Sequence, residues 1–192
     1  MAAFKRVTPP AAEPVAVADA RAFLRVAGEE DDALIARLIG AARERVEAET
    51  GRALLPQTWR MSADVAEGRA HGAFRVFALR RPPYLSFVEA RVAKEDGTST
   101  ALALDDVRVD ADANAVWLRL GGALLGARAW RPVELVWRCG YADAAAVPEA
   151  LKTAVLLLVA HAYERRDSLG APEAATPAGV SALLAPYREV RL

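Results

Sequence analysis

The sequence predicts an α+β protein in which a helical core carries an inserted antiparallel β domain. Two observations predict this fold class. Apolar residues recur at helical spacing near both ends of the chain, whereas the residues between about 55 and 140 alternate between apolar and polar. Helices at both ends with strands between them are most simply accommodated by a helical core that accepts a β insertion. We expect two N-terminal helices, a long central helix and a C-terminal helix.

The N-terminal part of the chain predicts an arm followed by two helices. Residues 1–15 contain three prolines and are expected to form a flexible arm. A short helix is predicted over Val17–Val26, and the run EEDD opens a second helix over Asp31–Glu49, which Gly51 ends. The apolar stripe of this second helix comprises Leu34, Ile35, Leu38, Ile39, Ala42 and Val46. Its charged residues Glu44, Arg45, Glu47 and Glu49 fall on or beside the opposite face.

Residues 55–140 predict one antiparallel sheet. The alternating runs are QTWRMSADV, AFRVFAL, LSFVEARVA, TALAL, DVRVD, AVWLRL and VELVWR. Asp96-Gly97 lies between two of these runs and is typical of a hairpin turn. The segment RRPPY interrupts the strands, because two adjacent prolines cannot donate hydrogen bonds to a ladder.

Helical periodicity returns after residue 140. Pro148 and Glu149 suit the first turn of a helix that runs to about Arg166 and is mostly apolar around its circumference. The segment LGAPEAATPAG is a linker, followed by the short amphipathic segment VSALLAPYREVRL. The predicted division is therefore a helical core of 16–54 and 141–170, a β insertion of 55–140, and a linker with a docking segment at 171–192.

Composition bounds the class of protein. Among 192 residues, Lys plus Arg and Asp plus Glu both number 25, so no basic excess points to nucleic-acid or membrane-surface binding. The longest apolar stretch, AVLLLVAHA, is far shorter than the ~20 residues needed to span a bilayer. The N-terminus lacks the apolar run of a signal peptide, so a soluble protein made in the cytoplasm is expected. Cys139 is the only cysteine and is expected to be a small buried strand residue.

The clearest candidates for chemistry are His161 and Glu164. They are three residues apart on a predicted helix and could share a metal ion, with Asp167 as a third ligand. A metal-dependent hydrolase or nuclease is thus one alternative function. The other interpretation, which we favour, is that His161 closes the buried face while Glu164, Arg165 and Arg166 are solvated at the helix end. The sequence contains no phosphate loop, nucleophile elbow or His-Glu-x-x-His motif, so neither enzyme activity nor a cofactor is expected.

Two further features admit a functional and a structural interpretation. The four tryptophans, Trp59, Trp117, Trp130 and Trp137, could stack on bases, but three lie in strand-like runs, which favours packing. The two N-terminal helices could form a helix-turn-helix of a DNA-binding regulator. The second helix carries as many acidic as basic residues, which makes it a poor match for phosphates.

The C-terminal segment carries an apolar face behind the predicted linker. Its apolar residues are Leu183, Leu184, Tyr187, Val190 and Leu192. Tethered amphipathic segments of this kind dock into a groove, either on their own core or on a partner. Composition leaves both possibilities open.

Several segments, in this order, together resemble phage head–tail connector (adaptor) proteins. They are PPAAEPVAVADARAFLRV, EDDALIARLIGAARERVEAETGRAL, RRPPYLSFVEARV, CGYADAAAVPEALKTAVLLLVAHAYERRDS and GVSALLAPYREV. The resemblance extends from about Thr8 to Val190 and is closest in style to the adaptors of long-tailed phages and of phage-like gene transfer agents. At Ala16 and Val17 the chain lacks the capping Thr or Ser that relatives commonly carry.

The resemblance implies a structural, non-enzymatic subunit. Such a subunit forms a ring of about twelve copies in the particle neck, between the portal protein and a tail-side neck protein (a stopper or tail terminator), and DNA passes through transiently. The family's portal-binding segment corresponds to Gly179–Leu192. The residues expected to bind the portal are Val180, Leu183, Leu184, Tyr187, Arg188, Val190 and Leu192. A DNA channel should not hold its cargo tightly, and we therefore expect the acidic residues Glu29, Glu30, Asp31 and Asp32 to face the lumen.

Overall fold

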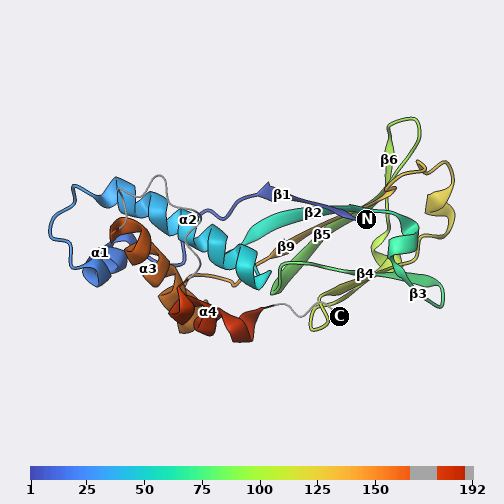
Figure 1. Cartoon of the computed structure of the whole chain (residues 1–192). Coiled ribbons are helices and arrows are strands. Elements are labelled where there is room, and N and C mark those ends of the chain that lie inside the picture. Colours follow the sequence, from blue (N-terminus) through green and yellow to red (C-terminus); the bar gives the residue numbers. More distant parts are fainter. Residues whose placement is uncertain (165–176, 189–192) are drawn as a thin grey trace. The chain divides into compact units, whose positions relative to one another are not determined.

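The computed structural model describes residues 1–164 and 177–188, and it divides the chain into two compact units (Figure 1). The β unit comprises residues 1–11 and 56–140. The helical unit comprises residues 12–55 and 141–192. The β unit therefore also contains the first residues of the chain.

The helical unit is built around an apolar core. Its helices are α1 (Val17–Leu24), α2 (Asp32–Thr50), α3 (Glu149–Glu164) and α4 (Ala178–Leu184). The residues with the least exposure in this core include Ile35, Ile39, Val46, Leu151, Val155, Val159, Val180 and Leu184. The apolar stripe predicted for the second helix thus faces α3, which packs along α2. Burying each of these side chains contributes about 1.5–3 kcal/mol.

The ends of the helices follow from local chemistry. Helix α1 starts after Ala16, whose side chain offers no cap, and ends two residues earlier than predicted. Arg25 adopts the left-handed conformation there, and its N–H together with that of Val26 closes the last turn on α1 carbonyls. Helix α2 ends at Gly51, whose φ of 73° is the left-handed geometry that glycine adopts freely. The predicted stop at Gly51 is therefore confirmed.

The β unit contains two antiparallel sheets, where the sequence predicts one. The first has the strand order β1-β2-β9-β5-β6 and the second has the order β3-β4-β8-β7. The strands are β1 (Ala3–Thr8), β2 (Gln57–Ala63), β3 (Arg69–His71), β4 (Phe74–Ala78), β5 (Tyr84–Ala93), β6 (Ser99–Ala101), β7 (Val107–Asp110), β8 (Ala115–Leu118) and β9 (Val133–Cys139). The segment RRPPY separates β4 from β5, and the two strands consequently join different sheets.

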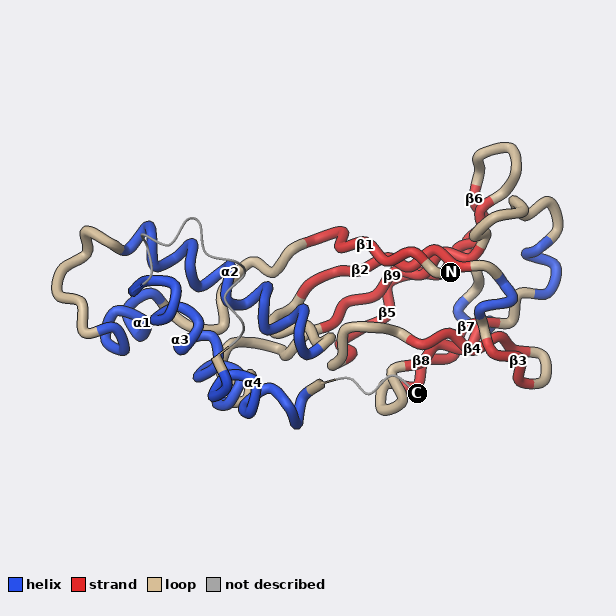
Figure 2. Tube along the Cα trace, viewed as in Figure 1, coloured by secondary structure: helices blue, strands red, loops and turns tan. Residues whose placement is uncertain are grey.

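The two sheets are separate layers within this unit (Figure 2). Alternate residues of each sheet are buried, as a packed face requires. In the first sheet these include Met61, Ala90, Val92, Leu135 and Trp137, and in the second Phe77, Val116 and Leu118. Cys139 is fully buried at the end of β9, which confirms the prediction that it is a buried strand residue.

The prediction of a flexible arm over residues 1–15 is wrong for its first part. Strand β1 pairs antiparallel with β2, from Ala3 opposite Ser62 to Thr8 opposite Thr58. The ring of Phe4 meets Trp137 edge to face, with centroids 6.4 Å apart, and the Arg80 guanidinium lies 4.4 Å from the Phe4 ring centroid. These contacts hold the segment on the sheet, and the three prolines all follow β1.

Candidate functional site

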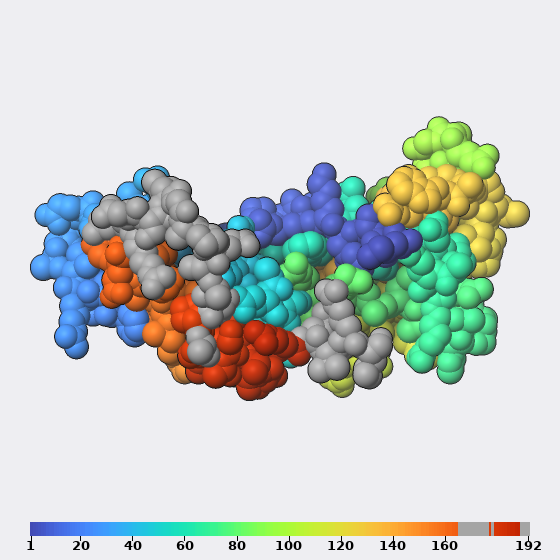
Figure 3. Space-filling view, in the orientation of Figure 1, coloured from blue at the N-terminus to red at the C-terminus, as the bar shows by residue number. Residues whose placement is uncertain are grey.

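The C-terminal segment packs against its own core. Val180 and Leu184 in α4 are fully buried in the helical unit, and Leu183 and Tyr187 pack against the same cluster. Figure 3 shows the surface of α4 in red beside that of α3 in orange. Of the two docking possibilities that composition leaves open, the described part of the segment therefore adopts the one on its own core.

Two arginines, Arg52 and Arg188, attach the residues after α4 to the helical unit. The Arg52 Nε donates to the Tyr187 carbonyl oxygen at 2.9 Å, and the same guanidinium lies 5.9 Å from the Tyr187 ring centroid. Exposed Arg188 reaches Glu49 on α2, with 3.5 Å between nitrogen and oxygen. Two other residues expected to bind the portal, Val190 and Leu192, lie outside the described residues.

The acidic run before α2 is partly occupied by internal contacts. Arg21 donates to the Gly28 carbonyl oxygen at 2.8 Å and forms ion pairs with Asp32 at 3.3 Å and Glu29 at 3.5 Å. The Tyr163 hydroxyl donates to Asp31. These bonds fix the start of α2 within the helical unit.

The four acidic residues therefore divide into two pairs. Asp31 and Asp32 are half-buried and engaged with groups of their own unit. Glu29 and Glu30 are exposed, and the Glu29 side chain keeps 80% of its surface accessible despite its ion pair. Only Glu29 and Glu30 thus present their carboxylates chiefly to solvent.

The helical unit contains a buried ionic cluster that the sequence analysis does not predict. Arg43 is only 6% exposed, and it donates to Glu13 at 2.8 Å and to Glu47 at 3.1 Å. Glu47, which the helical pattern assigns to the solvent side, is 4% exposed and also accepts the Leu54 N–H at 2.9 Å. Burial by itself lowers the pKa of Arg43, but the hydrogen bond with Glu13 and the charge of Glu47 raise it above its ordinary value. The cluster ties the segment before α1 and the segment after α2 to helix α2.

The structure separates the two candidates for metal chemistry from any third ligand among the described residues. His161 is half-buried and Glu164 is exposed at the end of α3. The buried Nε2 of His161 has no hydrogen-bond partner among residues 1–164 and 177–188. Across the same residues no three His, Cys, Asp or Glu side chains lie close enough to hold a metal ion. Asp167, Arg165 and Arg166 lie outside the described residues.

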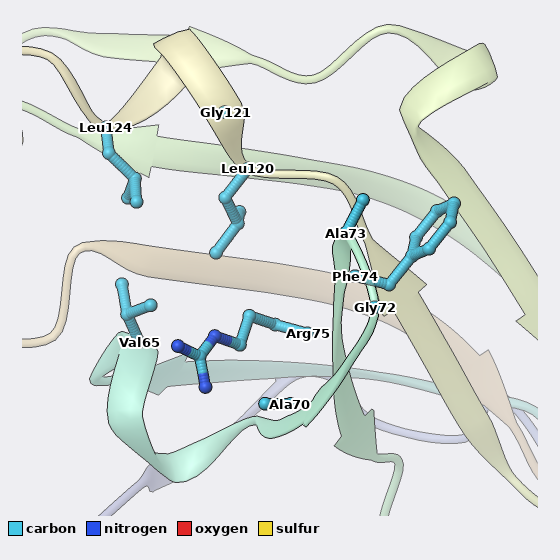
Figure 4. Close-up of a pocket in the computed structure, with 9 residues that line it drawn as sticks. All are labelled: Val65, Ala70, Gly72, Ala73, Phe74, Arg75, Leu120, Gly121 and Leu124. Atoms are coloured by element: carbon cyan, nitrogen blue, oxygen red, sulfur yellow. The ribbon is translucent and has the colours of Figure 1, made fainter.

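The β unit has a concavity of about 180 Å³ (Figure 4). Figure 4 shows the Arg75 side chain lying between Val65 and Leu120. Arg75 donates one long hydrogen bond, 3.4 Å, to the Gly68 carbonyl oxygen, and no carboxylate pairs with it in the described part of the chain. An aliphatic wall with a guanidinium at its centre could accept a carboxylate from a partner.

The tryptophans mostly pack, as the sequence favours. Trp137 is fully buried, and Trp117 meets His71 edge to face with centroids 4.8 Å apart. Trp130 differs, because it is 66% exposed and carries the Arg131 guanidinium 4.3 Å from its ring centroid. In the part of the chain that the structure describes, no helix is long and apolar enough to cross a membrane.

Comparison with known proteins gives consistent matches. The family model for phage gp6-like head–tail connector proteins matches residues 15–69, a stretch that contains α1, α2 and β2. A search among curated proteins gives no significant match. Three solved structures align with this chain almost from end to end.

All three structures are of gene transfer agent particles. A chain from the neck of an empty particle, computed with C6 symmetry, is 26% identical over 99% of this chain and 97% of its own, with a TM-score of 0.74. A chain from the virion of a native particle is 28% identical over 98% and 96%, with a TM-score of 0.71. A chain from the neck of a native particle, computed with C12 symmetry, is 25% identical over 99% and 97%, with a TM-score of 0.72.

The two kinds of match support the same conclusion. The family model matches the first part of the helical unit and the start of the β insertion, and the solved structures extend the likeness through both units. The resemblance that the sequence indicates is therefore confirmed: the chain is similar to phage gp6-like head–tail connector proteins over residues 15–69 and to gene transfer agent chains over both units.

Proposed function

We propose that this protein forms a homo-oligomeric ring in the neck of a phage or gene transfer agent particle, where it connects the head to the tail. The observation that carries the proposal is the likeness to particle-neck chains over 97% of their length. The two necks were computed with sixfold and twelvefold symmetry, which supports a ring of twelve copies. The role is structural and needs no turnover. No comparison supports the metal-dependent hydrolase or the helix-turn-helix regulator.

The proposed partners are the portal protein on one side and a tail-side neck protein, a stopper or tail terminator, on the other. Genome DNA passes through the ring only transiently. Of the acidic residues expected at the lumen, Glu29 and Glu30 are the pair that remains exposed, so we assign the lumenal role to them. Carboxylates at a channel wall repel the phosphates of DNA, so the DNA does not bind tightly to the wall.

Portal binding is assigned to the end of the C-terminal segment. Val180 and Leu184 cannot contact a partner without leaving the core, so they serve as the anchor. Arg188 is exposed, and its guanidinium reaches Glu49 at 3.5 Å. The portal-binding part therefore begins near Arg188 and includes Val190 and Leu192.

The test is a chain that stops after Arg188. Because it keeps Val180 and Leu184, it should unfold at the same denaturant concentration as the full chain, which is the control for folding. A deletion of residues 179–192 would lack this control because it removes core residues. We expect the shorter chain to leave DNA-filled heads without tails in electron micrographs. Tailed particles at the wild-type frequency would contradict the assignment of portal binding to this end.

A further inference from the structure

The first sheet of the β unit has two strand edges without partners. Strand β1 pairs only with β2, so its other side is free in the described structure. On the other side of the sheet, β6 pairs with Arg91–Ala93 of β5 alone, and the Leu102 N–H bonds the Ala90 carbonyl oxygen. No described strand covers Tyr84–Glu89 on the side away from β9. The two free edges, β1 and Tyr84–Glu89, are similar in length.

Both free edges expose apolar side chains where the pairing is irregular. The β1–β2 register shifts between Arg6 and Thr8, and Val7 at this shift is 45% exposed. The β5–β9 register shifts twice, and the residues at the shifts, Leu85 and Val88, are 36% and 50% exposed. Bulges and charges protect the edges of monomeric sheets from pairing. The residues at these bulges, Val7, Leu85 and Val88, are apolar and exposed, so they do not protect the edges in the way that charged residues would.

The directions of the strands make the two edges complementary. All neighbours in the order β1-β2-β9-β5 are antiparallel, so β1 and β5 run in opposite directions. Rotation about an axis close to the strand direction leaves each strand direction unchanged. A rotated copy that places its β1 beside β5 would therefore continue the antiparallel order. Two unlike patches that meet head to tail are what a ring with rotational symmetry needs.

The charges on the two edges are also complementary. Lys5 on β1 lies opposite Arg60, and it has no acidic partner among residues 1–164 and 177–188. Like charges directly opposite each other destabilise a strand pair. The register places Glu89 of β5 on the same sheet face as Lys5, because Arg60 pairs with Val136 and Val136 with Glu89. Glu89 already pairs with Arg91 of its own strand at 2.8 Å, and in a neighbouring copy its carboxylate would also reduce the repulsion between Lys5 and Arg60.

We propose that the ring is closed by pairing of β1 in one copy with Tyr84–Glu89 of β5 in the next, so that the five-stranded sheets join around it. The occupant of each free edge is thus a second copy of this chain. This inference rests on the proposed ring. In the joined sheet Val7 of one copy lies near Leu85 and Val88 of its neighbour, and all three lose contact with water. Bulges bend a strand and increase its twist, and such bending is needed where successive sheets join into a closed ring.

The test is cysteine crosslinking in assembled particles. In the chain carrying Val7→Cys and Val88→Cys, a short bis-maleimide should link neighbouring copies into a ladder of multimers that reaches the full ring on a denaturing gel. Each single variant should give no ladder, and the wild-type chain serves as background because Cys139 is fully buried. The matched control pairs Val7→Cys with Val109→Cys, since Val109 is 37% exposed on β7, an edge strand of the other sheet.

The outcomes separate this inference from the proposed function. A ladder from the Val7/Val88 pair with none from the Val7/Val109 pair supports edge-to-edge pairing. If particle necks contain the doubly substituted chain and it forms no ladder, or if the control pair links equally well, the edge pairing is overturned while the ring function stands. If immunogold labelling finds the wild-type protein absent from necks, the proposed function fails, and the inference fails with it.

Discussion

The Tyr163 hydroxyl donates a hydrogen bond to the Asp31 carboxylate, which joins the last turn of α3 to the residue before α2. The sequence offers His161 and Glu164, which flank Tyr163 at this end of α3, as candidates for chemistry. In the structure the tyrosine instead fixes the acidic start of a neighbouring helix. This contact gives the cluster a structural role that neither helix reveals alone.

Removal of this hydroxyl should destabilise the helical unit slightly. Tyr163→Phe keeps the ring and loses a hydrogen bond to a carboxylate that is only half-buried, so we expect the free energy of unfolding to fall by about 1 kcal/mol. Urea denaturation would measure the change. Tyr141→Phe is the matched control, since Tyr141 packs on the same core without a hydrogen bond from its hydroxyl to described residues. An equal loss in both variants would contradict the role of Asp31.

The buried ionic cluster predicts a larger effect. Arg43→Met keeps most of the side-chain volume but leaves the Glu13 and Glu47 carboxylates without their cation, and Glu47 is 4% exposed. Breaking a buried pair by removing one partner costs about 3 kcal/mol or more of unfolding free energy. The control is Arg45→Met, which breaks the more exposed Arg45–Glu49 pair and should cost no more than about 0.5 kcal/mol. Equal losses of unfolding free energy in the two variants, measured in urea because guanidinium chloride screens ion pairs, would show that burial of Arg43 adds nothing to its contribution.

The anchor of the C-terminal segment can be tested in the same way. Leu184→Ala opens a cavity in the helical core, and we expect a loss of about 2–4 kcal/mol of unfolding free energy. Leu183→Ala, at a half-buried site one residue earlier, should cost clearly less. Calorimetric unfolding of the two variants would decide. If the two substitutions lower the free energy of unfolding equally, α4 does not pack with Leu184 facing the core and Leu183 partly exposed.

The helices were more predictable from the sequence than the sheets. A single apolar stripe from Leu34 to Val46 fixes both the period and the buried face of α2, and Gly51 supplies its end through backbone freedom. Strand partners are not local, so nothing in LSFVEARVA or AFRVFAL states that these runs belong to different sheets. The break at RRPPY was visible, but its consequence for the sheet order depends on contacts far apart in the chain.

Two errors have the same physical origin. The helical pattern predicts Glu47 on or beside the solvent face, where a carboxylate is usually solvated. Its burial depends on Arg43 and Glu13, and Glu13 lies far away in the sequence. Three prolines predict a flexible arm over residues 1–15, yet β1 ends before the first proline and pairs with β2. In both cases a distant partner overrides the local pattern.

Charge reversal at the proposed lumen should slow DNA passage without disturbing the fold. Glu29→Lys with Glu30→Lys adds two cations at exposed positions, and each can bind a phosphate. Particles should assemble and carry tails, while DNA release becomes slower and more dependent on salt. Fluorescence of a DNA dye during ejection would measure the rate. The control is Glu95→Lys at an exposed turn of the β unit; an equal effect there would remove the lumenal assignment.

The contact between Arg52 and Tyr187 should control tail attachment more than stability. Arg52→Ala removes the hydrogen bond to the Tyr187 carbonyl oxygen and the cation above its ring, whereas Val180 and Leu184 keep α4 in the core. We therefore expect a loss of only about 1 kcal/mol in unfolding free energy but fewer tailed particles, because the portal-binding end is no longer held in place. Arg52→Lys should restore attachment only in part, since an ammonium cannot reproduce the planar contact. The fraction of tailed particles in each variant would be counted in electron micrographs. A wild-type fraction in Arg52→Ala would show that the position of this segment does not matter for docking.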